Sequence, residues 1–465
     1  MENEVQMQIN LNKSAGNDFR QALRNGEFIF LSEALIPPGE KELAKLGERI
    51  VPFAEKMWSF TDLHGGVAVP DHFDAAWSAA DIAAVFPREQ RSKNIFFISG
   101  SGRSLNSCRD EMTVAANNQA MNIVPVSGNA APFTLNECRN RDFTGSVTAL
   151  ETARENGNFF TGAVFNPYHY TLGTLQSAFS NLEQKIAAGA EYIIVQAGWD
   201  MLQLQALRWY LIKRKLCTPL IARLQLLSPA KVEKIAAGNE PGMRISGEFL
   251  RQLEHELRGS RAQFDSAQYR RLEIQIAGCR LMGYSGVLIS GVDFPGTAEI
   301  IAARVRSALE EFSSFEQWLD EYTRHHGGAE MNNASLSDYR LYDRFIYRDY
   351  PIDDPPEEHS GDARLSRWDK ISYAIRKRLF AKSGQLPASR DKLLKNLFTG
   401  CPGCDQCTLA QNEFVCIAHC PKHLQHGPCG GVQLDGKCEI GDFECPFVKK
   451  ARIYHWRNIQ KNLES

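Results

Sequence analysis

Short apolar runs alternate along the chain with longer segments whose apolar residues recur at helical spacing. Continuous apolar runs are typical of parallel strands that are buried on both faces. The predicted strands are 28–35, 57–62, 94–99, 122–127, 162–166, 191–198, 219–227 and 285–293. The segments 174–190 and 266–283 are examples of the helices expected between them, and Gly283 is a suitable C-terminal cap for the second.

Eight strand-then-helix units within about 270 residues match the count and size of a (β/α)8 TIM-type barrel. A doubly wound open sheet is the alternative fold, because periodicity alone does not show whether a sheet closes. In a barrel of this type the chemistry gathers at the C-terminal ends of the strands. Residues at those ends are therefore the first candidates for a functional site.

The composition changes after residue 312, where turn-forming and charged residues become frequent. We expect three parts: the barrel over residues 1–315, an irregular connector over 316–365, and a small Cys-rich metal-binding domain over 366–465. Helices are predicted at 368–380 and 449–463, on either side of the cysteines.

Eight of the twelve cysteines lie between residues 401 and 445. The candidate metal ligands are Cys401, Cys404, Cys407, Cys416, Cys420, Cys429, Cys438 and Cys445. The first three follow the C-x2-C-x2-C spacing that opens a 4Fe–4S pattern, and the closing C-x3-C-P element stands apart from them at 416–421. Eight thiolates match two 4Fe–4S clusters; zinc sites of four cysteines each and metal-free thiols are the alternatives.

Composition and charge narrow the class of protein. The formal net charge of −2 argues against a nucleic-acid partner, which would need clustered positive charge. No run approaches the roughly 18 apolar residues of a membrane span, and the polar N-terminus lacks the apolar core of a signal peptide. We therefore expect a cytoplasmic protein, in a compartment where thiols stay reduced and disulfides are disfavoured.

The segment 420–447 resembles the C-terminal module found in some bacterial methylenetetrahydrofolate reductases. It contains Cys-Pro-Lys at 420–422, Gly-Pro-Cys-Gly-Gly at 427–431 and Gly-x-Cys-Glu at 436–439, in the order of the family. The resemblance implies that this module carries metal clusters that deliver electrons.

The predicted barrel resembles methylenetetrahydrofolate reductase more distantly. In "SEALIPP", Glu33 corresponds to the general acid of the family, although one extra residue separates it from the prolines. The resemblance places Thr61 of "WSFTD" and Lys185 of "KIAAGAEYIIVQ" beside a flavin, FAD or FMN. It places Gln196, the last residue of the same stretch, on the pterin of tetrahydrofolate.

Several positions depart from the family pattern. Asn129 follows the fourth strand where an aspartate is common, and it can still hydrogen-bond a pterin or a flavin. The third strand lacks a histidine, and Ala178 stands where an acid often binds the flavin's hydroxyl groups. His169, between two tyrosines after the fifth strand, is a candidate for stacking on a flat cofactor ring or for packing at the rim.

The chemistry of folate reduction makes definite demands on such a site. Hydride must pass from a reduced flavin to an iminium carbon, and opening the five-membered ring to that iminium needs a proton donor near the pterin. We expect partial burial at the barrel mouth to raise the pKa of Glu33 and so to suit it to that task.

We therefore expect an oxidoreductase that interconverts 5,10-methylene- and 5-methyl-tetrahydrofolate in one-carbon metabolism. An electron-donor or methyltransferase protein is the expected partner, and the chain is expected to form an oligomer. The departures from the family pattern favour an alternative: a flavin-less folate-binding protein that serves a corrinoid or demethylation system. A third hypothesis is a zinc-stabilised scaffold whose C-terminal module only makes subunit contacts.

Overall fold

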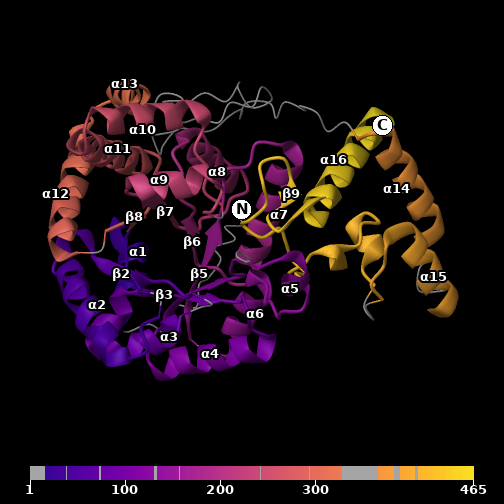
Figure 1. Ribbon diagram of the computed structural model, residues 1–465, viewed down its shortest axis with the longest axis horizontal. Coiled ribbons are helices and arrows are strands. Elements are labelled where there is room, and N and C mark those ends of the chain that lie inside the picture. Colours follow the sequence, from indigo (N-terminus) through magenta and orange to yellow (C-terminus); the bar gives the residue numbers. More distant parts are fainter. Residues whose placement is uncertain are drawn as a thin grey trace, which may run out of the picture.

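The computed structural model in Figure 1 describes most of the chain. The described residues are 16–37, 39–72, 75–129, 133–156, 158–240, 242–292, 294–326, 365–381, 388–403 and 407–464. The predicted metal ligand Cys404 lies outside these ranges.

Within the described residues, eight parallel strands follow one another in chain order and close into a barrel. They are β1 (Ile29–Glu33), β2 (Gly66–Val69), β3 (Ile95–Ser99), β4 (Asn122–Val126), β5 (Phe160–Phe165), β6 (Tyr192–Val195), β7 (Leu220–Gln225) and β8 (Gly286–Ser290). Pairing of β1 with β8, which sets Ile29 opposite Gly286, completes the ring. The predicted (β/α)8 fold is confirmed, and the open sheet is excluded.

Helices surround the strands (Figure 1). Around the barrel they are α1 (Asp18–Arg24), α2 (Leu43–Trp58), α3 (Ala79–Ile82), α4 (Leu105–Asn117), α5 (Leu135–Arg139), α6 (Ser146–Asn156), α7 (Leu172–Ala187), α8 (Met201–Lys213), α9 (Pro229–Ala236), α10 (Gly247–Gly259), α11 (Arg261–Leu281), α12 (Pro295–Glu311) and α13 (Phe315–His326). The helices predicted at 174–190 and 266–283 correspond to α7 and α11. Gly283 follows α11 with a φ of 74°, the left-handed conformation that glycine adopts without strain.

The strand predicted at 57–62 is wrong. Met57 and Trp58 are buried residues at the end of α2, and Thr61–Leu63 form a short 3-10 turn. This apolar run therefore belongs to the core-facing side of an amphipathic helix, whose period a short window does not reveal. The true second strand, Gly66–Val69, contains small residues and is only four residues long.

The end of the barrel at which the strands begin is closed by apolar packing. Phe19 of α1 makes edge contacts with Phe160 of β5 and Tyr192 of β6, at centroid distances of 5.8 and 5.1 Å. These residues join one buried cluster with inward-facing strand residues such as Ile29 and Leu31. Because this end is filled by apolar side chains, polar groups inside the barrel are confined to the opposite end.

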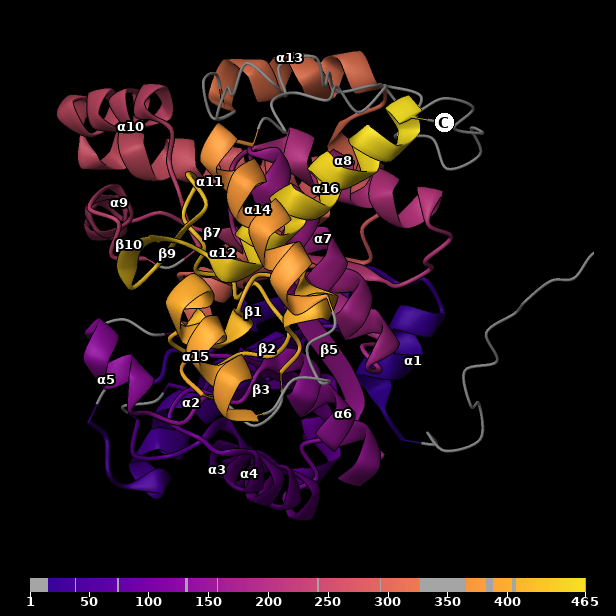
Figure 2. The same cartoon turned by 90° about the vertical axis from the view of Figure 1, so that its right-hand side faces the viewer.

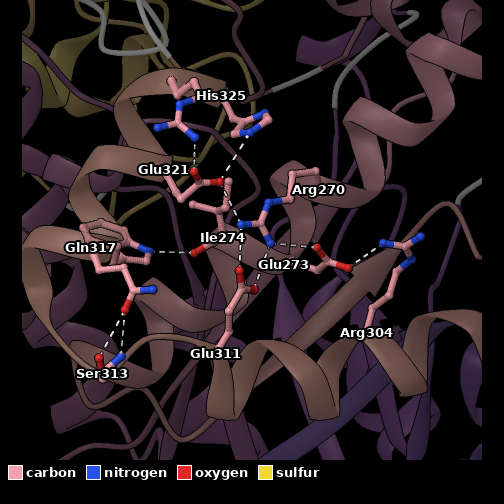
Figure 3. A network of polar contacts seen from close by, with 11 residues as sticks. Arg270, Glu273, Ile274, Arg304, Glu311, Ser313, Gln317, Glu321 and His325 are labelled. Carbon is pink, nitrogen blue, oxygen red and sulfur yellow. Dashed lines mark hydrogen bonds and ion pairs between the residues drawn. The ribbon is translucent and has the colours of Figure 1, made fainter.

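Helix α13 occupies the start of the segment that was expected to be irregular. Its Trp318 is fully buried and donates a hydrogen bond from Nε1 to the Ile274 carbonyl of α11, at 2.9 Å. Arg270 of α11 joins three helices, because its Nη2 lies 2.7 Å from Glu311 of α12 and 2.8 Å from Glu321 of α13 (Figure 3). The helix is therefore part of the barrel's outer layer, and the predicted connector does not begin at residue 316.

We expect Arg270→Met to lower the free energy of unfolding by about 2–3 kcal/mol, because it leaves half-buried carboxylates without their partner. Arg324→Met is the matched control, since Arg324 binds the same Glu321 from a side chain that is 68% exposed. Its cost should stay below about 0.5 kcal/mol. Urea denaturation measures both values, and equal losses in the two variants would contradict this role for Arg270.

The C-terminal part packs against one side of the barrel. It consists of α14 (Arg367–Phe380), α15 (Ala388–Thr399), the two-stranded sheet of β9 (Lys437–Cys438) and β10 (Gly441–Glu444), and α16 (Pro446–Glu464). Figures 1 and 2 show α16 running alongside α7. The helices predicted at 368–380 and 449–463 are confirmed as α14 and α16. Across the described ranges, every helix is too short or too polar to cross a membrane.

Candidate functional site

The inward faces of three barrel strands change from apolar to polar along their length. Side chains of a strand alternate between its two faces, so every second residue points into the barrel. The inward series are Ile29, Leu31 and Glu33 on β1; Tyr192, Ile194 and Gln196 on and just after β6; and Ile221 and Arg223 on β7. The polar member ends each series, so these polar groups meet at the C-terminal mouth of the barrel.

Arg223 holds the polar groups of the mouth together. Its Nη2 donates to Glu33 Oε2 at 2.6 Å, and its Nη1 donates to Gln196 Oε1 at 3.3 Å. Its Nε donates to the Ser290 hydroxyl at 2.8 Å, and that hydroxyl in turn donates to Glu33. The structure thus brings the predicted general acid and the predicted pterin-binding glutamine to one arginine.

The pKa of Glu33 lies below its ordinary value. Burial opposes ionisation and by itself would raise this pKa, but the positive charge of Arg223 and the hydrogen bonds from Ser290 and Arg223 outweigh it. His72, which follows β2, lowers the pKa further. The expectation that burial raises the pKa of Glu33 is therefore wrong while Arg223 remains beside it. In this arrangement Glu33 is a carboxylate that accepts hydrogen bonds.

Sequence reasoning missed Arg223, Ser290 and His72. Arg223 had a visible signal, because it interrupts the apolar run of its strand, "LIARLQ". His72 was hidden by the error in the second strand, since a strand placed at 57–62 puts residue 72 far from any strand end. Ser290 had no signal of its own, because a serine after "GVLI" is unremarkable in sequence.

Thr61 is separated from the other predicted site residues. It is exposed in the 3-10 turn that precedes β2, whereas Glu33 ends β1. In a parallel barrel, residues before a strand and residues after a strand lie at opposite ends. The misplaced strand therefore also misplaced Thr61, and this structure gives no support for a flavin contact there.

Lys185 and His169 both lie in buried surroundings at the β5–β6 side. The Lys185 ammonium donates to the Val164 carbonyl at 2.8 Å, and burial lowers its pKa to about 8, although nearby Cys429 opposes that change. His169 is 3% exposed, and burial lowers its pKa to about 4, so its ring is neutral at pH 7. Neither residue is placed like Glu33 or Gln196 around Arg223.

Asn129 is exposed after β4, and its backbone carbonyl accepts a hydrogen bond from Ser101 at 3.0 Å. The preceding residue, Gly128, is where the C-terminal part reaches the barrel. Lys422, only 2% exposed, donates to the Gly128 carbonyl at 2.8 Å and lies 2.5 Å from Glu439 Oε1. Burial opposes the charge of Lys422, but Cys429 and Glu439 together raise its pKa above the ordinary value.

A second contact lies on the β5–β6 side of the mouth. Asn166, directly after β5, donates from Nδ2 to the Gly430 carbonyl at 3.4 Å and to the Gly242 carbonyl at 3.3 Å. Gly242 lies close to Gln196, because a Cβ added at Gly242 would be only 3.0 Å from Gln196 Nε2. The Gly-Pro-Cys-Gly-Gly segment is therefore a neighbour of the predicted pterin-binding residue.

Two histidines just before this segment, His423 and His426, also contact the barrel. His423 Nε2 lies 2.9 Å from the Arg139 carbonyl of α5, and His426 Nδ1 lies 2.9 Å from Gln184 Oε1 of α7. Both rings are thus engaged with oxygen atoms of the barrel.

The described cysteines of the C-terminal part fall into two groups along the chain. Cys420 and Cys445 belong to one buried cluster, and Cys429 packs against it. The pKa of Cys429, Cys438 and Cys445 is raised, first by burial and also by Cys420. Of the earlier group, Cys407 is exposed, whereas Cys401 and Cys416 are half-buried.

The described cysteines are neither cross-linked nor gathered as metal ligands. No disulfide joins any of them. No group of three or more Cys, His, Asp or Glu side chains among the described residues, which exclude Cys404, has metal-binding geometry. The iron–sulfur and zinc assignments therefore stay predictions.

The C-terminal part is similar to one known protein family. A family model described as "Methylene-tetrahydrofolate reductase C terminal" matches residues 382–465. The resemblance found in the sequence of this part is thereby confirmed. No curated protein matches the chain.

Two solved structures match part of the chain weakly. One is a protein from Clostridium thermocellum described as uncharacterised and as binding two copies of 5-methyl-5,6,7,8-tetrahydrofolic acid; it is 14% identical, over 62% of this chain and 99% of its own, with a TM-score of 0.46. The other is a candidate dihydrodipicolinate synthetase from Pseudomonas aeruginosa; it is 13% identical, over 60% of this chain and 99% of its own, with a TM-score of 0.29. At these TM-scores neither likeness carries an argument.

Removing the charge at position 223 should change the ionisation of Glu33. In Arg223→Met the strongest opposing influence is gone, so burial should raise the pKa of Glu33 above its ordinary value. Infrared spectra recorded across a pH titration measure this pKa, and the carboxylate band that disappears in Glu33→Gln identifies the residue. Arg306→Met, which removes a surface partner of Asp62, is the control. An unchanged Glu33 pKa in Arg223→Met would show that Arg223 does not govern it.

Proposed function

We propose that this chain is a folate-dependent oxidoreductase of the methylenetetrahydrofolate reductase type, which interconverts 5,10-methylene- and 5-methyl-tetrahydrofolate. One observation supports this most strongly. A module that matches the C-terminal family of these reductases is docked at the barrel mouth where Arg223 joins Glu33 and Gln196. The module that would carry electrons and the polar side chains that would bind folate are therefore neighbours in one chain.

The mouth has the hydrogen-bonding chemistry that a pterin edge requires. A pterin presents donors and acceptors side by side, and the Gln196 amide can both donate and accept. Glu33 supplies an acceptor with negative charge, and Arg223 supplies donors in a planar fork. These groups would hold the ring in one orientation at the end of the barrel.

Glu33 must take up a proton before it can deliver one. Because Arg223 lowers its pKa, Glu33 is ionised at neutral pH and carries no proton to donate. A pterin that takes over hydrogen bonds of Arg223 would weaken that ion pair, and burial would then raise the pKa of Glu33. Ligand binding would thus convert Glu33 from a carboxylate into a group able to protonate 5,10-methylene-tetrahydrofolate as the five-membered ring that contains its methylene bridge opens.

We expect Glu33→Gln to lower the rate of 5-methyl-tetrahydrofolate oxidation, with a dye as electron acceptor, by about 100-fold or more, because glutamine cannot transfer the proton. Calorimetry should show folate affinity within about 3-fold of the wild type, since glutamine keeps an acceptor oxygen. Glu48→Gln, at an exposed site on α2, is the control. Full turnover in Glu33→Gln would remove Glu33 from the mechanism, and a wild type that binds no folate would refute the proposed function.

The two kinds of predicted cofactor, a flavin and metal centres, differ in how their predicted ligands are placed. A flavin would supply the hydride, but its predicted contacts do not gather at one place, since Thr61 lies at the opposite end of the barrel from Glu33. Thiolates suit iron–sulfur clusters or zinc, and Cys420 and Cys445 belong to one buried cluster of the module, against which Cys429 packs. The candidate metal ligands thus belong to one module, although no described group of them has metal-binding geometry, whereas the predicted flavin contacts lie at opposite ends of the barrel.

The departures from the family pattern at Asn129 and Ala178 favour a second candidate function. In this alternative the barrel binds 5-methyl-tetrahydrofolate without a flavin and presents it to a methyltransferase or corrinoid protein. Glu33 and Arg223 would then hold the pterin, and no hydride transfer would be required. The two candidates differ in cofactor content, which is directly measurable.

We expect protein purified without oxygen to be brown and to contain about eight iron atoms per chain, as two 4Fe–4S clusters require. Cys438→Ser should remove about half of the iron, whereas Cys217→Ser, at an exposed cysteine of the barrel, should remove none. An added flavin spectrum would favour the reductase, and its absence would favour the flavin-less candidate. Colourless protein containing zinc would contradict electron transfer by the module.

A further inference from the structure

The C-terminal part is fixed to the barrel mouth on the β4 side by a buried ammonium group. Lys422 is 2% exposed, and its ammonium binds both Glu439 of its own module and the Gly128 carbonyl after β4. The same ammonium lies 5.7 Å from the centroid of the Phe143 ring. A buried charge needs partners in defined positions, so this contact sets where the module lies relative to the mouth.

On the β5–β6 side the contact is made by backbone rather than by a side chain. The Gly430 carbonyl accepts a hydrogen bond from Asn166, which also binds Gly242. A Cβ at Gly242 would stand 3.1 Å from the Gly430 oxygen and 3.0 Å from Gln196 Nε2. Gly430 is therefore the part of the module that comes next to the Gln196 side of the mouth.

Packing requires a glycine at position 431 but not at the adjacent position 430. A Cβ at Gly431 would lie 2.1 Å from Glu439 Oε2, so the packing of the Lys422–Glu439 pair excludes a side chain there. At Gly430 no heavy atom lies within 4 Å of an added Cβ, and the residue has no positive φ. Neither backbone conformation nor packing requires a glycine at position 430.

We propose that the C-terminal module forms one wall of the folate site, with Gly430 leaving room for the bound ligand and Lys422 positioning the wall. This inference rests on the proposed binding of a reduced folate at the mouth. Gly430 is exposed, and its backbone adjoins Gly242, which in turn adjoins Gln196. A flat ring held by Gln196 would cover Gly430, and a side chain at this position would stand in its way. The folate site is then incomplete without residues that lie more than 200 positions further along the chain than Gln196.

The wall is tested by adding a side chain where the fold tolerates one. Gly430→Leu should weaken the binding of 5-methyl-tetrahydrofolate to the full chain at least tenfold in calorimetry and leave the melting temperature unchanged. Gly296→Leu is the matched control, because Gly296 on α12 also has no positive φ and no heavy atom within 4 Å of an added Cβ. Binding by Gly430→Leu within twofold of the wild type would overturn the wall.

A different result would refute the proposed function rather than the wall. If the wild-type chain does not bind 5-methyl-tetrahydrofolate, the proposed function is refuted, and the position of the wall is then judged by hydrogen exchange without ligand. The double variant Lys422→Met/Glu439→Gln removes the bond to Gly128 without leaving one buried charge unpaired.

In that double variant, amides at 126–129 and 429–432 should exchange at least tenfold faster, whereas β1 should exchange as in the wild type. Unchanged exchange in both segments would overturn the role of Lys422 in positioning the module.

Discussion

A charged arginine inside an otherwise apolar barrel determines the arrangement of the mouth. Arg223 belongs to β7, whose preceding inward residue, Ile221, is buried in the barrel interior. A guanidinium in such a position requires nearby acceptors, because burying an unpaired charge is costly. Glu33, Gln196 and Ser290 surround the guanidinium, from β1, β6 and β8 or the residues next to them. One side chain thus ties together strands that are far apart in the sequence.

The same arginine decides the electrostatics of the proposed chemistry. A carboxyl group at this depth would otherwise favour the neutral form, which suits a proton donor. Arg223 reverses that preference, so the acidity of Glu33 depends on how strongly the arginine is engaged. A ligand that competes for the guanidinium would therefore act on the protonation of Glu33 without needing any movement of the backbone.

The barrel and the C-terminal module meet at this mouth rather than at a distant surface. The three motifs by which the module resembles its family have local structural roles: Lys422 and Glu439 form a buried ion pair, and Gly431 leaves the space that Glu439 fills. The pair also reaches the barrel through the Gly128 carbonyl. The residues that identify the module in sequence are thus also residues that dock it.

The sequence predicted the barrel well because buried parallel strands leave a strong signal in one dimension. The second strand escaped because its four residues are small, while the apolar end of α2 imitated a strand. Glu33 and Gln196 were found through the family resemblance, and the structure joins them. Their link through Arg223 could not be predicted, because it depends on which inward positions of β1, β6 and β7 lie at the same height. Helix α13 was missed because its many charged residues are also typical of a solvated loop. The sequence does not show that one of them, Glu321, binds Arg270.

The most direct test of this account is an experimental structure of the full chain with 5-methyl-tetrahydrofolate. The account predicts the pterin at the C-terminal mouth of the barrel, with its edge within hydrogen-bond distance of Gln196 and Glu33 and its body beside Gly430. A pterin bound elsewhere, or a mouth in which Arg223 keeps all its present partners while folate occupies another surface, would contradict it.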